Sequence, residues 1–377
     1  MKTRRLIALA MGHMASDLYP GMLSPLLPLI LCRYDLSMAM AGVLIMVLQF
    51  SCNMSQPVFA FINDSRPVKS LLWIGLLVSA LPFAVLFKLN RIELMIAALA
   101  VSGIGVGMFH PVAVVAAGKN ARDNRNGISM AIFSSGGSFG FMIAPLVVVI
   151  IVEHLGLCFM PLVLIPALVM SVLFIIDSEI AVNKRREATI GEWLSTLGEA
   201  KRELFILYLV ATFCAIVSMN IGAFLPILAI ARGASYVTSA YFLSGTLFAS
   251  MIGMFIGGHL SDIHGRRRVM GITLLVSAPL LFIFLHTDGV VSIVALMLGM
   301  AALTSTIPVN IYLAQTVAPK HASIASSIVM GLPYAVAAIV APPFGALADR
   351  VGIESAMNVM IAIPVLGAIS CMFLRHE

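Results

Sequence analysis

Residues 258–268 read GHLSDIHGRRR and lie between two long apolar runs, 237–260 and 269–286. An aspartate, a glycine and three arginines fall within this short stretch. An apolar run of about 20 residues, rising about 1.5 Å per residue as a helix, is long enough to cross a bilayer. The arginines are typical of a segment at the cytoplasmic surface of a membrane. The stretch therefore predicts a short, tight turn between two membrane-spanning helices.

Apolar runs of this length recur along the whole chain of 377 residues, of which 60% are hydrophobic and 11% charged. Soluble globular domains carry about 25% charged residues, so the composition indicates a membrane protein. Twelve runs lie at roughly 6–31, 39–62, 71–89, 94–117, 127–152, 157–176, 204–231, 237–260, 269–286, 290–316, 323–348 and 355–374. Backbone polar groups in lipid have to be paired within their own segment, which favours helices, and the alternation of a β-barrel is absent. We predict an all-α polytopic membrane protein with twelve transmembrane helices.

The basic residues are distributed unevenly between the two sides of this topology. With the N-terminus inside, 18 of the 23 Lys and Arg residues fall on the inner side, and the outer side has only Arg33, Lys88, Arg91, Arg232 and Arg350. Cytoplasmic loops carry such an excess, so both termini are expected in the cytoplasm. The net charge of +6 then reflects topology and not nucleic-acid binding. The five cysteines are scattered and form neither a disulfide framework nor a metal-ligand spacing.

The two halves of the chain repeat each other. Leu27-Pro28 and Asp64 recur 198 residues later, at Leu225-Pro226 and Asp262, and Pro111 and Ala144-Pro145 recur 197 residues later, at Pro308 and Ala341-Pro342. Internal repeats in a chain with many spans are typical of transporters, whose substrate site lies near the membrane midplane between the repeats. We predict six-helix bundles at 1–177 and 204–377. The segment between them, 178–203, is predicted to be a cytoplasmic linker with a short amphipathic helix.

The stretch at 258–268 resembles the loop signature of the major facilitator superfamily. The matching positions are Gly258, Leu260, Ser261, Asp262, Gly265, Arg266 and Arg267. The counterpart in the first half, AFINDSRPVKSL at 60–71, keeps Asp64 and Lys69 but has Pro67 in place of the glycine. This resemblance implies the major facilitator fold, with two pseudo-symmetric six-helix bundles, and a gating role for these loop residues.

Three further stretches narrow the resemblance to the fosmidomycin-resistance group of that superfamily. They are HMASDLYPGMLSPLLPLI in the first span, GIGVGMFHP in the fourth and FSSGGSFGFMIAPL in the fifth. The resemblance implies an efflux protein of the bacterial inner membrane. The third stretch also partly matches the antiporter motif of drug exporters, at Gly137, Gly140 and Pro145, but Ala144 replaces the usual glycine.

Asp17 is the one acidic residue that we place deep inside a span. A carboxylate at mid-depth is costly unless it is protonated, paired or hydrated. His13 lies one helical turn earlier on the same face, and His110 in the fourth span is expected at a similar depth, roughly 12–14 Å from the cytoplasmic edge at about 1.5 Å per residue. In the superfamily fold, the first and fourth spans face the central cavity. We predict that Asp17, His13 and His110 couple transport to protons, and a structural hydrogen-bonding role stays open for each histidine.

Other polar residues within the spans are candidates for the lining of the substrate cavity. They are Tyr19, Gln49, Asn53, Ser134, Ser135, Asn220, Asn310 and Tyr334. Hydrogen bonding between helices is the alternative role for each of them. The sequence has no nucleotide motif and no nucleophile constellation, so we predict neither a cofactor nor enzyme activity.

Together these features predict a monomeric secondary transporter that moves a small polar or anionic solute or drug by alternating access, with proton-coupled efflux favoured. A proton-coupled importer and a non-transporting receptor built on a transporter fold stay open as alternatives. An intramembrane enzyme is disfavoured because Asp17 has no second deep carboxylate beside it. A channel is poorly suited to an architecture of two repeats.

Overall fold

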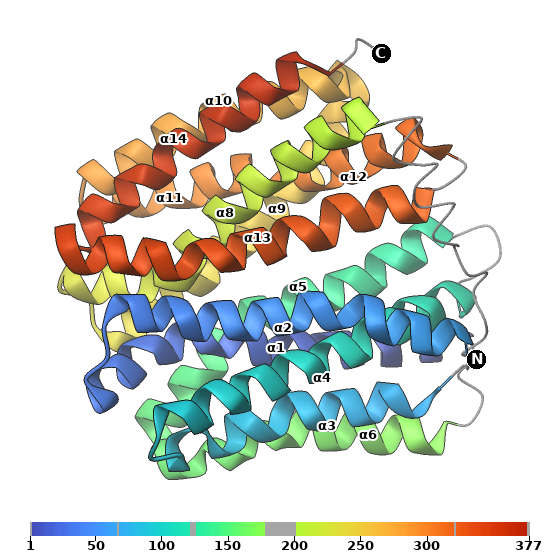
Figure 1. Ribbon diagram of the computed structural model, residues 1–377, viewed down its shortest axis with the longest axis vertical. Helices are drawn as coiled ribbons and strands as arrows, with labels where there is room; N and C mark the ends of the chain where they lie inside the picture. The colour runs from blue at the N-terminus through green and yellow to red at the C-terminus, as the bar shows by residue number, and fades with distance from the viewer. Residues whose placement is uncertain (1, 66–67, 121–125, 178–200, 320–321, 375–377) are drawn as a thin grey trace. The chain divides into compact units, whose positions relative to one another are not determined.

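The computed structural model describes residues 2–65, 68–120, 126–177, 201–319 and 322–374. These residues form helices joined by short turns, and no strand occurs among them (Figure 1). Twelve helical segments of the described chain are long and apolar enough to cross a membrane, and their bounds agree with the predicted runs to within a few residues. The predicted all-α fold with twelve spans is confirmed.

The first six spans are built from six long helices and three short helical segments. The long helices are α1 (Lys2–Tyr34), α2 (Met38–Ser65), α3 (Ser70–Val85), α4 (Ile92–Lys119), α5 (Asn126–Val149) and α6 (Leu164–Ile176). The short segments are η1 (Leu86–Lys88) after α3, η2 (Ile150–Leu155) after α5 and η3 (Leu157–Val163) before α6. Gly156, with a φ of 91°, makes the tight turn between the fifth and sixth spans, a conformation that glycine adopts without strain.

The last six spans are built from seven helices. They are α8 (Lys201–Ala231), α9 (Tyr236–His264), α10 (Arg266–His286), α11 (Gly289–Thr304), α12 (Thr306–Val317), α13 (Ala322–Val351) and α14 (Ile353–Met372). The tenth span is divided between α11 and α12 because Pro308 has no N–H to donate to the carbonyl of Thr304. Beside this break the hydroxyl of Thr304 lies 3.0 Å from the carbonyl of Ser250, which belongs to the neighbouring helix α9.

Residue contacts divide the chain into two compact units. The first comprises Met1–Tyr34 and Leu44–Glu187, and the second comprises Asp35–Val43 and Ala188–Glu377. In the first unit α1 packs on α5, and α3 packs on α4 and α6. In the second unit α8 packs on α13 and α14, and α10 packs on α11 and α14. The predicted linker 178–203, with its amphipathic helix, lies outside the described residues, apart from the last three positions of the linker, which begin α8.

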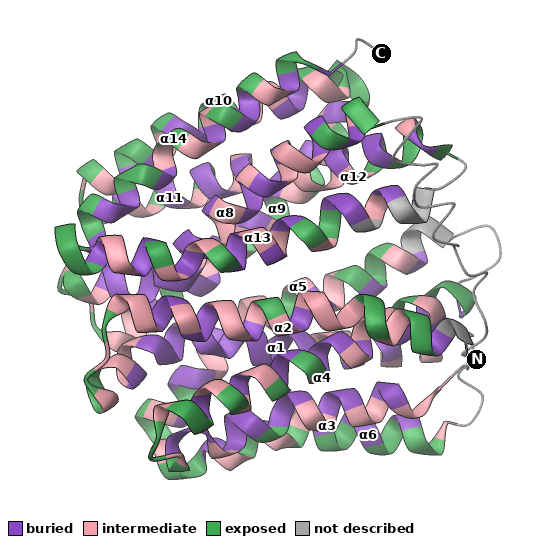
Figure 2. Cartoon of the chain, viewed as in Figure 1, coloured by how far each residue is buried: buried purple, intermediate pink, exposed green. Residues whose placement is uncertain are grey.

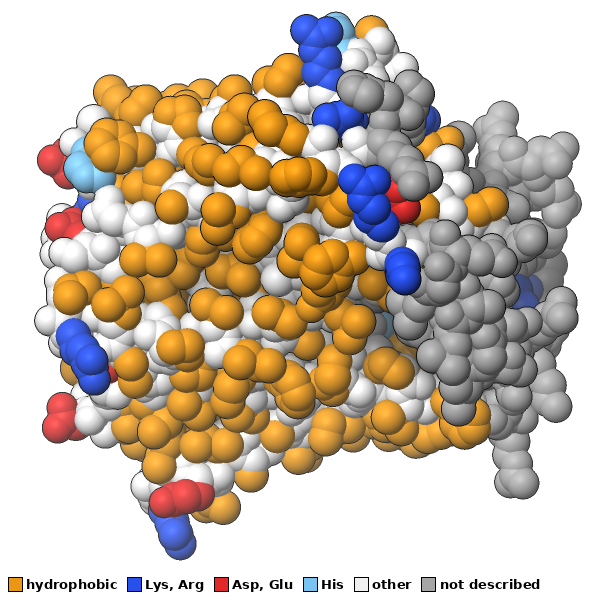
Figure 3. All heavy atoms as spheres, turned by 45° about the horizontal axis from the view of Figure 1, so that its top comes forward, with side chains coloured by type: hydrophobic (Ala, Val, Ile, Leu, Met, Phe, Trp, Pro, Cys, Tyr) orange, Lys and Arg blue, Asp and Glu red, His pale blue; other side chains and the backbone are white. Residues whose placement is uncertain are grey.

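The surfaces of the spans suit a lipid environment. Large apolar side chains are widely exposed, among them Val290 at 76%, Ile176 at 73% and Phe61 at 66%. Soluble proteins seldom expose contiguous apolar surface on this scale. In Figure 3 hydrophobic side chains make up most of the face in view, and the charged ones lie toward its margins. Buried and exposed residues alternate along most of the helices (Figure 2), whereas α1 is buried over most of its length.

Candidate functional site

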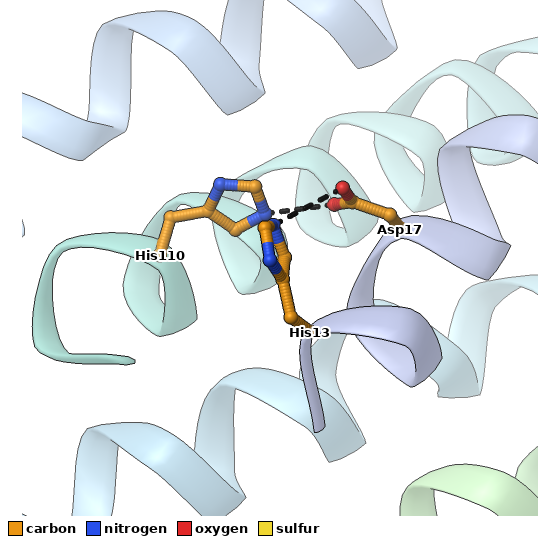
Figure 4. A group of neighbouring side chains, drawn as sticks. All are labelled: His13, Asp17 and His110. Atoms are coloured by element: carbon orange, nitrogen blue, oxygen red, sulfur yellow. Dashed lines mark hydrogen bonds and ion pairs between the residues drawn. The ribbon is translucent and has the colours of Figure 1, made fainter. Parts of the chain in front are cut away.

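The candidate site lies in the first unit, where α1 and α4 bring three titratable side chains together. Asp17 and His13 are one turn apart on α1, and His110 comes from α4; Figure 4 shows both imidazoles turned toward the carboxylate. Nε2 of His110 lies 2.8 Å from one carboxylate oxygen of Asp17, and Nε2 of His13 lies 3.2 Å from the other. The two imidazole rings are 4.9 Å apart. The two histidines therefore contact the same carboxylate directly, as the depths derived from the sequence suggest.

This His13–Asp17–His110 cluster is withdrawn from solvent. Asp17 is 6% exposed, and its ion-pair partners are the two histidines. Unlike Lys or Arg, an imidazole changes its charge in the physiological pH range. Because a buried carboxylate is costly without a compensating charge or hydrogen bond, the stability of the cluster depends on the protons that the histidines hold.

The hydrogen bond on the far side of His13 determines which of its nitrogens can exchange a proton with Asp17. Nδ1 lies 2.9 Å from the carbonyl oxygen of Phe133 on α5. A carbonyl can only accept, so Nδ1 donates, and in neutral His13 the other nitrogen, Nε2, carries a lone pair. That lone pair faces an oxygen of Asp17, which is also an acceptor when the carboxylate is ionised. The two atoms attract each other only when a proton lies between them, so the pair has a place for one additional proton.

Gly137 on α5 leaves the space that the His13–Asp17 pair occupies. A Cβ at this position would lie 2.6 Å from Nε2 of His13 and still closer to a carboxylate oxygen of Asp17. The neighbouring Gly136 lies instead against the backbone of α1, where a Cβ would collide with the carbonyl of Ala10. The two glycines therefore have different roles. Gly136 allows α1 and α5 to pack closely, and Gly137 leaves room for the side chains of His13 and Asp17.

Two parts of the site were not predicted from the sequence. Phe133 takes part through its backbone carbonyl, which no side-chain pattern reveals, and through its ring, which stacks on His13 at 4.4 Å between centroids. Gly137 belongs to the glycine-rich stretch of α5, and its match to the antiporter motif was the available signal. The two predicted lining residues that precede it on α5 differ in exposure, since Ser134 is exposed and Ser135 is half-buried.

The other predicted lining residues of the first unit mostly bond within the protein. Tyr19 is completely buried, and its hydroxyl donates to the carbonyl of Val163 at 3.0 Å. In this structure Tyr19 packs in the core and anchors α1, and its place in the cavity lining stays a prediction. Asn53 and Gln49 are half-buried on α2, and the side-chain amide of Asn53 donates to the carbonyl of Gln49 one turn earlier at 2.8 Å.

In the second unit, two predicted lining residues join helices through the NH₂ groups of their side-chain amides. The NH₂ group of Asn220 lies 3.4 Å from the carbonyl of Ala337 on α13, and that of Asn310 donates to the carbonyl of Leu207 on α8 at 3.0 Å. The side-chain oxygens of both asparagines are buried and have no hydrogen-bond partner among the described residues. Tyr334 is half-buried on α13.

The loop motif of the second half forms a single-residue turn. Gly265, with a φ of 87°, is the only residue between α9 and α10, and this backbone conformation favours glycine. Asp262 lies in the last turn of α9 and pairs with Arg266 at 3.8 Å. Gly258 makes no close contact that requires a glycine. The side chain of Asp64, the counterpart of Asp262 in the first half, lies outside the described residues.

Lys69 and Arg267 occupy equivalent positions and have the same structural partner, the C-terminal end of the last helix of their own half. Arg267 donates to the carbonyls of Cys371 at 3.0 Å and Met372 at 2.5 Å, at the end of α14. Lys69 donates to the carbonyl of Asp177, just beyond α6. Basic groups are favourable there, because the last carbonyls of a helix have no partner and carry the negative end of its dipole. Burial lowers the pKa of Lys69, and the charge of Asp177 opposes that shift.

The site also has a geometry that a small cation fits. The ligand atoms of His13, Asp17 and His110 all lie within 4.8 Å of one another. The sequence analysis predicted no metal site, and His110 lies far along the chain from the His13–Asp17 pair. Tests of proton binding therefore need a chelator, so that a cation effect is kept apart from a proton effect.

Comparison with known proteins identifies the family and two relatives of the chain. The family model described as Major Facilitator Superfamily matches residues 9–329. The chain is 25% identical to the fosmidomycin resistance protein of Escherichia coli (strain K12), across 98% of this chain and 93% of that one. It is 26% identical to the uncharacterized MFS-type transporter YfnC of Bacillus subtilis (strain 168), across 97% and 91% of the two chains.

Solved transporter structures share the fold. A bacterial homologue of the human lysosomal transporter Spinster, inward-facing and occupied, superposes with a TM-score of 0.79 at 14% identity, covering 99% of this chain and 96% of that chain. The transporter FucP in its outward conformation superposes with a TM-score of 0.66 at 17% identity, covering 99% of each chain. These similarities confirm the predicted architecture.

Proposed function

Because this chain belongs to the major facilitator superfamily, a family of membrane transporters, we propose that it is a secondary transporter driven by the proton gradient. In this proposal it expels a small polar or anionic solute or drug from a bacterial cell, as a monomer in the inner membrane. Both termini lie in the cytoplasm, in keeping with the excess of basic residues on that side. Its partners are the bilayer, protons and the transported molecule.

The observation that carries the proposal is the position between His13 and Asp17 where one proton can bind. Nε2 of His13 and a carboxylate oxygen of Asp17 are both acceptors when no extra proton is bound, yet they lie 3.2 Å apart in a buried position. A proton that enters this pair stabilises it, and a proton that leaves makes it repulsive. Loading and release therefore change the energy of the α1–α4–α5 contact, which is what an alternating-access transporter needs in order to link proton movement to conformation.

The proposed cycle assigns a role to each residue. Asp17 and His13 take up the proton when the protein is open to the outside and release it to the cytoplasm after the protein has changed state. His110, 2.8 Å from Asp17, stabilises the carboxylate after the proton has left and binds an anionic group of the solute. Outward movement of the solute against inward movement of the proton is antiport.

The proposed direction and substrate class draw on the names of the relatives. The printed name of the 25% identical Escherichia coli protein refers to fosmidomycin, so fosmidomycin is the first compound to test. A similar fold is also found in the fucose:proton symporter FucP, at 18% identity, which keeps the proton-coupled importer as the second candidate. A receptor that transports nothing is the third, and the transport assay below separates the three.

The test uses purified protein in proteoliposomes that contain a pH-sensitive dye, with EDTA present throughout. Solute and proton fluxes are measured under an imposed pH difference for the native chain, Asp17→Asn and Ser102→Ala. Ser102 is a matched control, since its buried hydroxyl joins two helices of the same unit by donating to the carbonyl of Ser79 at 2.7 Å without titrating. We expect solute and protons to move in opposite directions in the native chain and the control, with no uphill transport in Asp17→Asn.

Movement of both species in the same direction would establish the importer instead. Uphill transport by Asp17→Asn at the native rate would show that the coupling assignment is wrong. A second readout needs no substrate. The pH dependence of the imidazole NMR signals of His13 should differ between the native chain and Asp17→Asn, and an identical pH dependence in the two chains would contradict the shared proton.

A further inference from the structure

The three side chains of the His13–Asp17–His110 cluster also form a set of ligands for one divalent cation. Two imidazoles and one carboxylate suit Zn²⁺ and the neighbouring transition metals, whereas Mg²⁺ and Ca²⁺ prefer oxygen ligands. The ligand atoms all lie within 4.8 Å of one another. They come from α1 and α4, which belong to the same compact unit, so the geometry depends on one bundle alone.

The distances between the ligand atoms are close to those that a bound cation requires. Zn²⁺ lies about 2.0–2.2 Å from nitrogen and oxygen ligands, so two ligand atoms of a tetrahedral site are about 3.4 Å apart. Nε2 of His13 is 3.2 Å from one carboxylate oxygen of Asp17, and Nε2 of His110 is 2.8 Å from the other. Small changes in side-chain torsion are therefore enough to place the three ligands around a single ion.

The hydrogen bond between His13 and Phe133 prepares His13 for this role. Nδ1 of His13 lies 2.9 Å from the carbonyl oxygen of Phe133, and because a carbonyl only accepts, the lone pair stays on Nε2, which faces Asp17. Metal-binding histidines usually donate their second nitrogen to a carbonyl or a carboxylate, which fixes the tautomer and the orientation of the ring. The ring of Phe133 also stacks on His13 at 4.4 Å between centroids. His13 is thus oriented as a metal ligand before an ion binds.

The surroundings of the cluster favour a cation. Asp17 is 6% exposed, and in the part of the chain that the structure describes no Lys or Arg forms an ion pair with it. A buried carboxylate attracts a cation more strongly than an exposed one, because little water screens the two charges. The side chain of His110 is the most exposed of the three, at 21% against 12% for His13 and 9% for Asp17, which leaves the side of His110 for a water ligand.

We propose that this cluster binds one transition-metal cation of the Zn²⁺ type, held by Nε2 of both histidines and a carboxylate oxygen of Asp17. The cation takes the lone pair of His13 that the shared proton otherwise takes, so the two exclude each other and bound metal blocks proton-driven transport. This block rests on the proposed function, whereas the site itself does not, because it needs only the three ligands.

Binding is measured by isothermal titration calorimetry on purified protein without a polyhistidine tag, in a chain that lacks the two exposed cysteines, Cys32 and Cys158. Zn²⁺ is the probe, and Mg²⁺ is the comparison that prefers oxygen ligands. We expect one Zn²⁺ to bind per chain and to raise the melting temperature, with no response to Mg²⁺. His110→Gln keeps a donor for Asp17 but removes one ligand. It should weaken Zn²⁺ binding more than about tenfold, since loss of a residue that only orients a metal ligand already costs about 10–100-fold.

His286→Gln is the matched control. Nδ1 of His286 on α10 lies 2.9 Å from the carbonyl oxygen of Phe282, and its ring stacks on that of Phe282 at 4.0 Å, but within the described residues it forms no ion pair with a carboxylate. Its surroundings thus repeat those of His13 without Asp17, and the substitution should leave Zn²⁺ binding unchanged. Failure of the native chain to bind Zn²⁺, or equal weakening in the two variants, would overturn the site.

Flux measurements separate this inference from the proposed function. Replacing EDTA by Zn²⁺ in the proteoliposome assay should slow uphill transport by the native chain, and restoring EDTA should restore the rate. Zn²⁺ binding without any loss of transport would overturn the block. Proton coupling is tested independently, by the comparison of the native chain with Asp17→Asn in EDTA, where no metal is bound.

Discussion

In the first unit the contact between the first and fourth spans joins Asp17 to His110 at 2.8 Å, whereas in the second unit the corresponding contact joins Cys214 to Thr306 at 3.2 Å. The 198-residue offset pairs Asp17 with Ala215, directly beside Cys214. The repeated fold thus places a polar contact at the same helix crossing in both halves. Only in the first half does that contact carry a carboxylate and imidazoles that titrate.

The two halves differ in the same way on the neighbouring helix. The 197-residue offset pairs Gly137, which leaves room for the His13–Asp17 pair, with Tyr334 of α13. The second half therefore fills with a side chain the position that the first half leaves open. By contrast, Lys69 and Arg267 keep the same structural partner in both halves. The repeat preserves what holds each bundle together, and the titratable chemistry is found in one copy.

The largest expected effect comes from removing the polar group at one of these two helix crossings. Asp17→Asn removes the negative charge that both histidines contact, so we expect uphill, pH-driven transport to fall to the level of empty liposomes. Cys214→Ala removes the equivalent contact in the second half, where a thiol meets a hydroxyl and no carboxylate takes part, and most of the native rate should remain. Initial rates of solute and proton movement in proteoliposomes measure both. Similar losses in the two variants would mean that the crossings have the same, structural role.

The fold was predictable from the sequence because each of its signals is local or periodic. Apolar runs, the excess of basic residues on one side and repeated landmarks such as Pro111 and Pro308 need no long-range information. The division of the tenth span at Ser305 was not predicted, although Pro308 is its cause. In the equivalent fourth span Pro111 leaves α4 unbroken, so the same residue has different consequences in different packing.

The sequence predicts how deep each site residue lies in the membrane, because depth can be counted along a helix, but it does not predict every contact between helices. Counting residues from the cytoplasmic edge placed His13 and His110 at one level, and the contact between them could be expected from that. The donation from His13 to the carbonyl of Phe133 could not, because it depends on how α5 packs against α1. Tyr19 lies two residues after Asp17, so helix geometry turns its side chain toward the other side of α1, where it donates to the carbonyl of Val163.

A smaller effect is expected from filling the space at Gly137. In Gly137→Ala the added methyl group pushes His13 and Asp17 apart, and displacements on this scale at a reacting pair reduce rates roughly tenfold or more. Half-maximal transport should also move to lower pH, because the weakened pair holds its shared proton less tightly. Gly136→Ala is the control, since its methyl group meets the backbone of Ala10 and not the pair. If both variants have the native pH profile, Gly137 is a packing residue and does not position the pair.

The comparison between Arg267 and Lys69 predicts changes in stability without a change in coupling. Arg267 contacts two carbonyls at the end of α14, and Arg267→Ala should lower the free energy of unfolding by about 1 kcal/mol, as for other cations at helix C-termini. Lys69 contacts one carbonyl, and Lys69→Ala should have a smaller effect. Thermal unfolding in detergent measures both, alongside the ratio of protons to solute transported. A change in that ratio would show that these residues take part in gating and do more than cap helices.

The smallest expected effect is a dependence of stability on alkaline pH that belongs to Lys69 alone. Burial lowers the pKa of Lys69 from its ordinary value of 10.5, and the charge of Asp177 only partly offsets this. The folded protein therefore binds this proton more weakly than the unfolded chain does, so the protonated lysine costs stability below the folded pKa. As the pH rises through the folded pKa toward 10.5, that cost is relieved and the native chain should gain stability relative to Lys69→Arg, whose guanidinium stays charged. Thermal unfolding of the two chains between neutral and alkaline pH measures the gain. A difference in melting temperature that stays constant over this range would show that the position of Lys69 in the fold leaves its proton affinity unchanged.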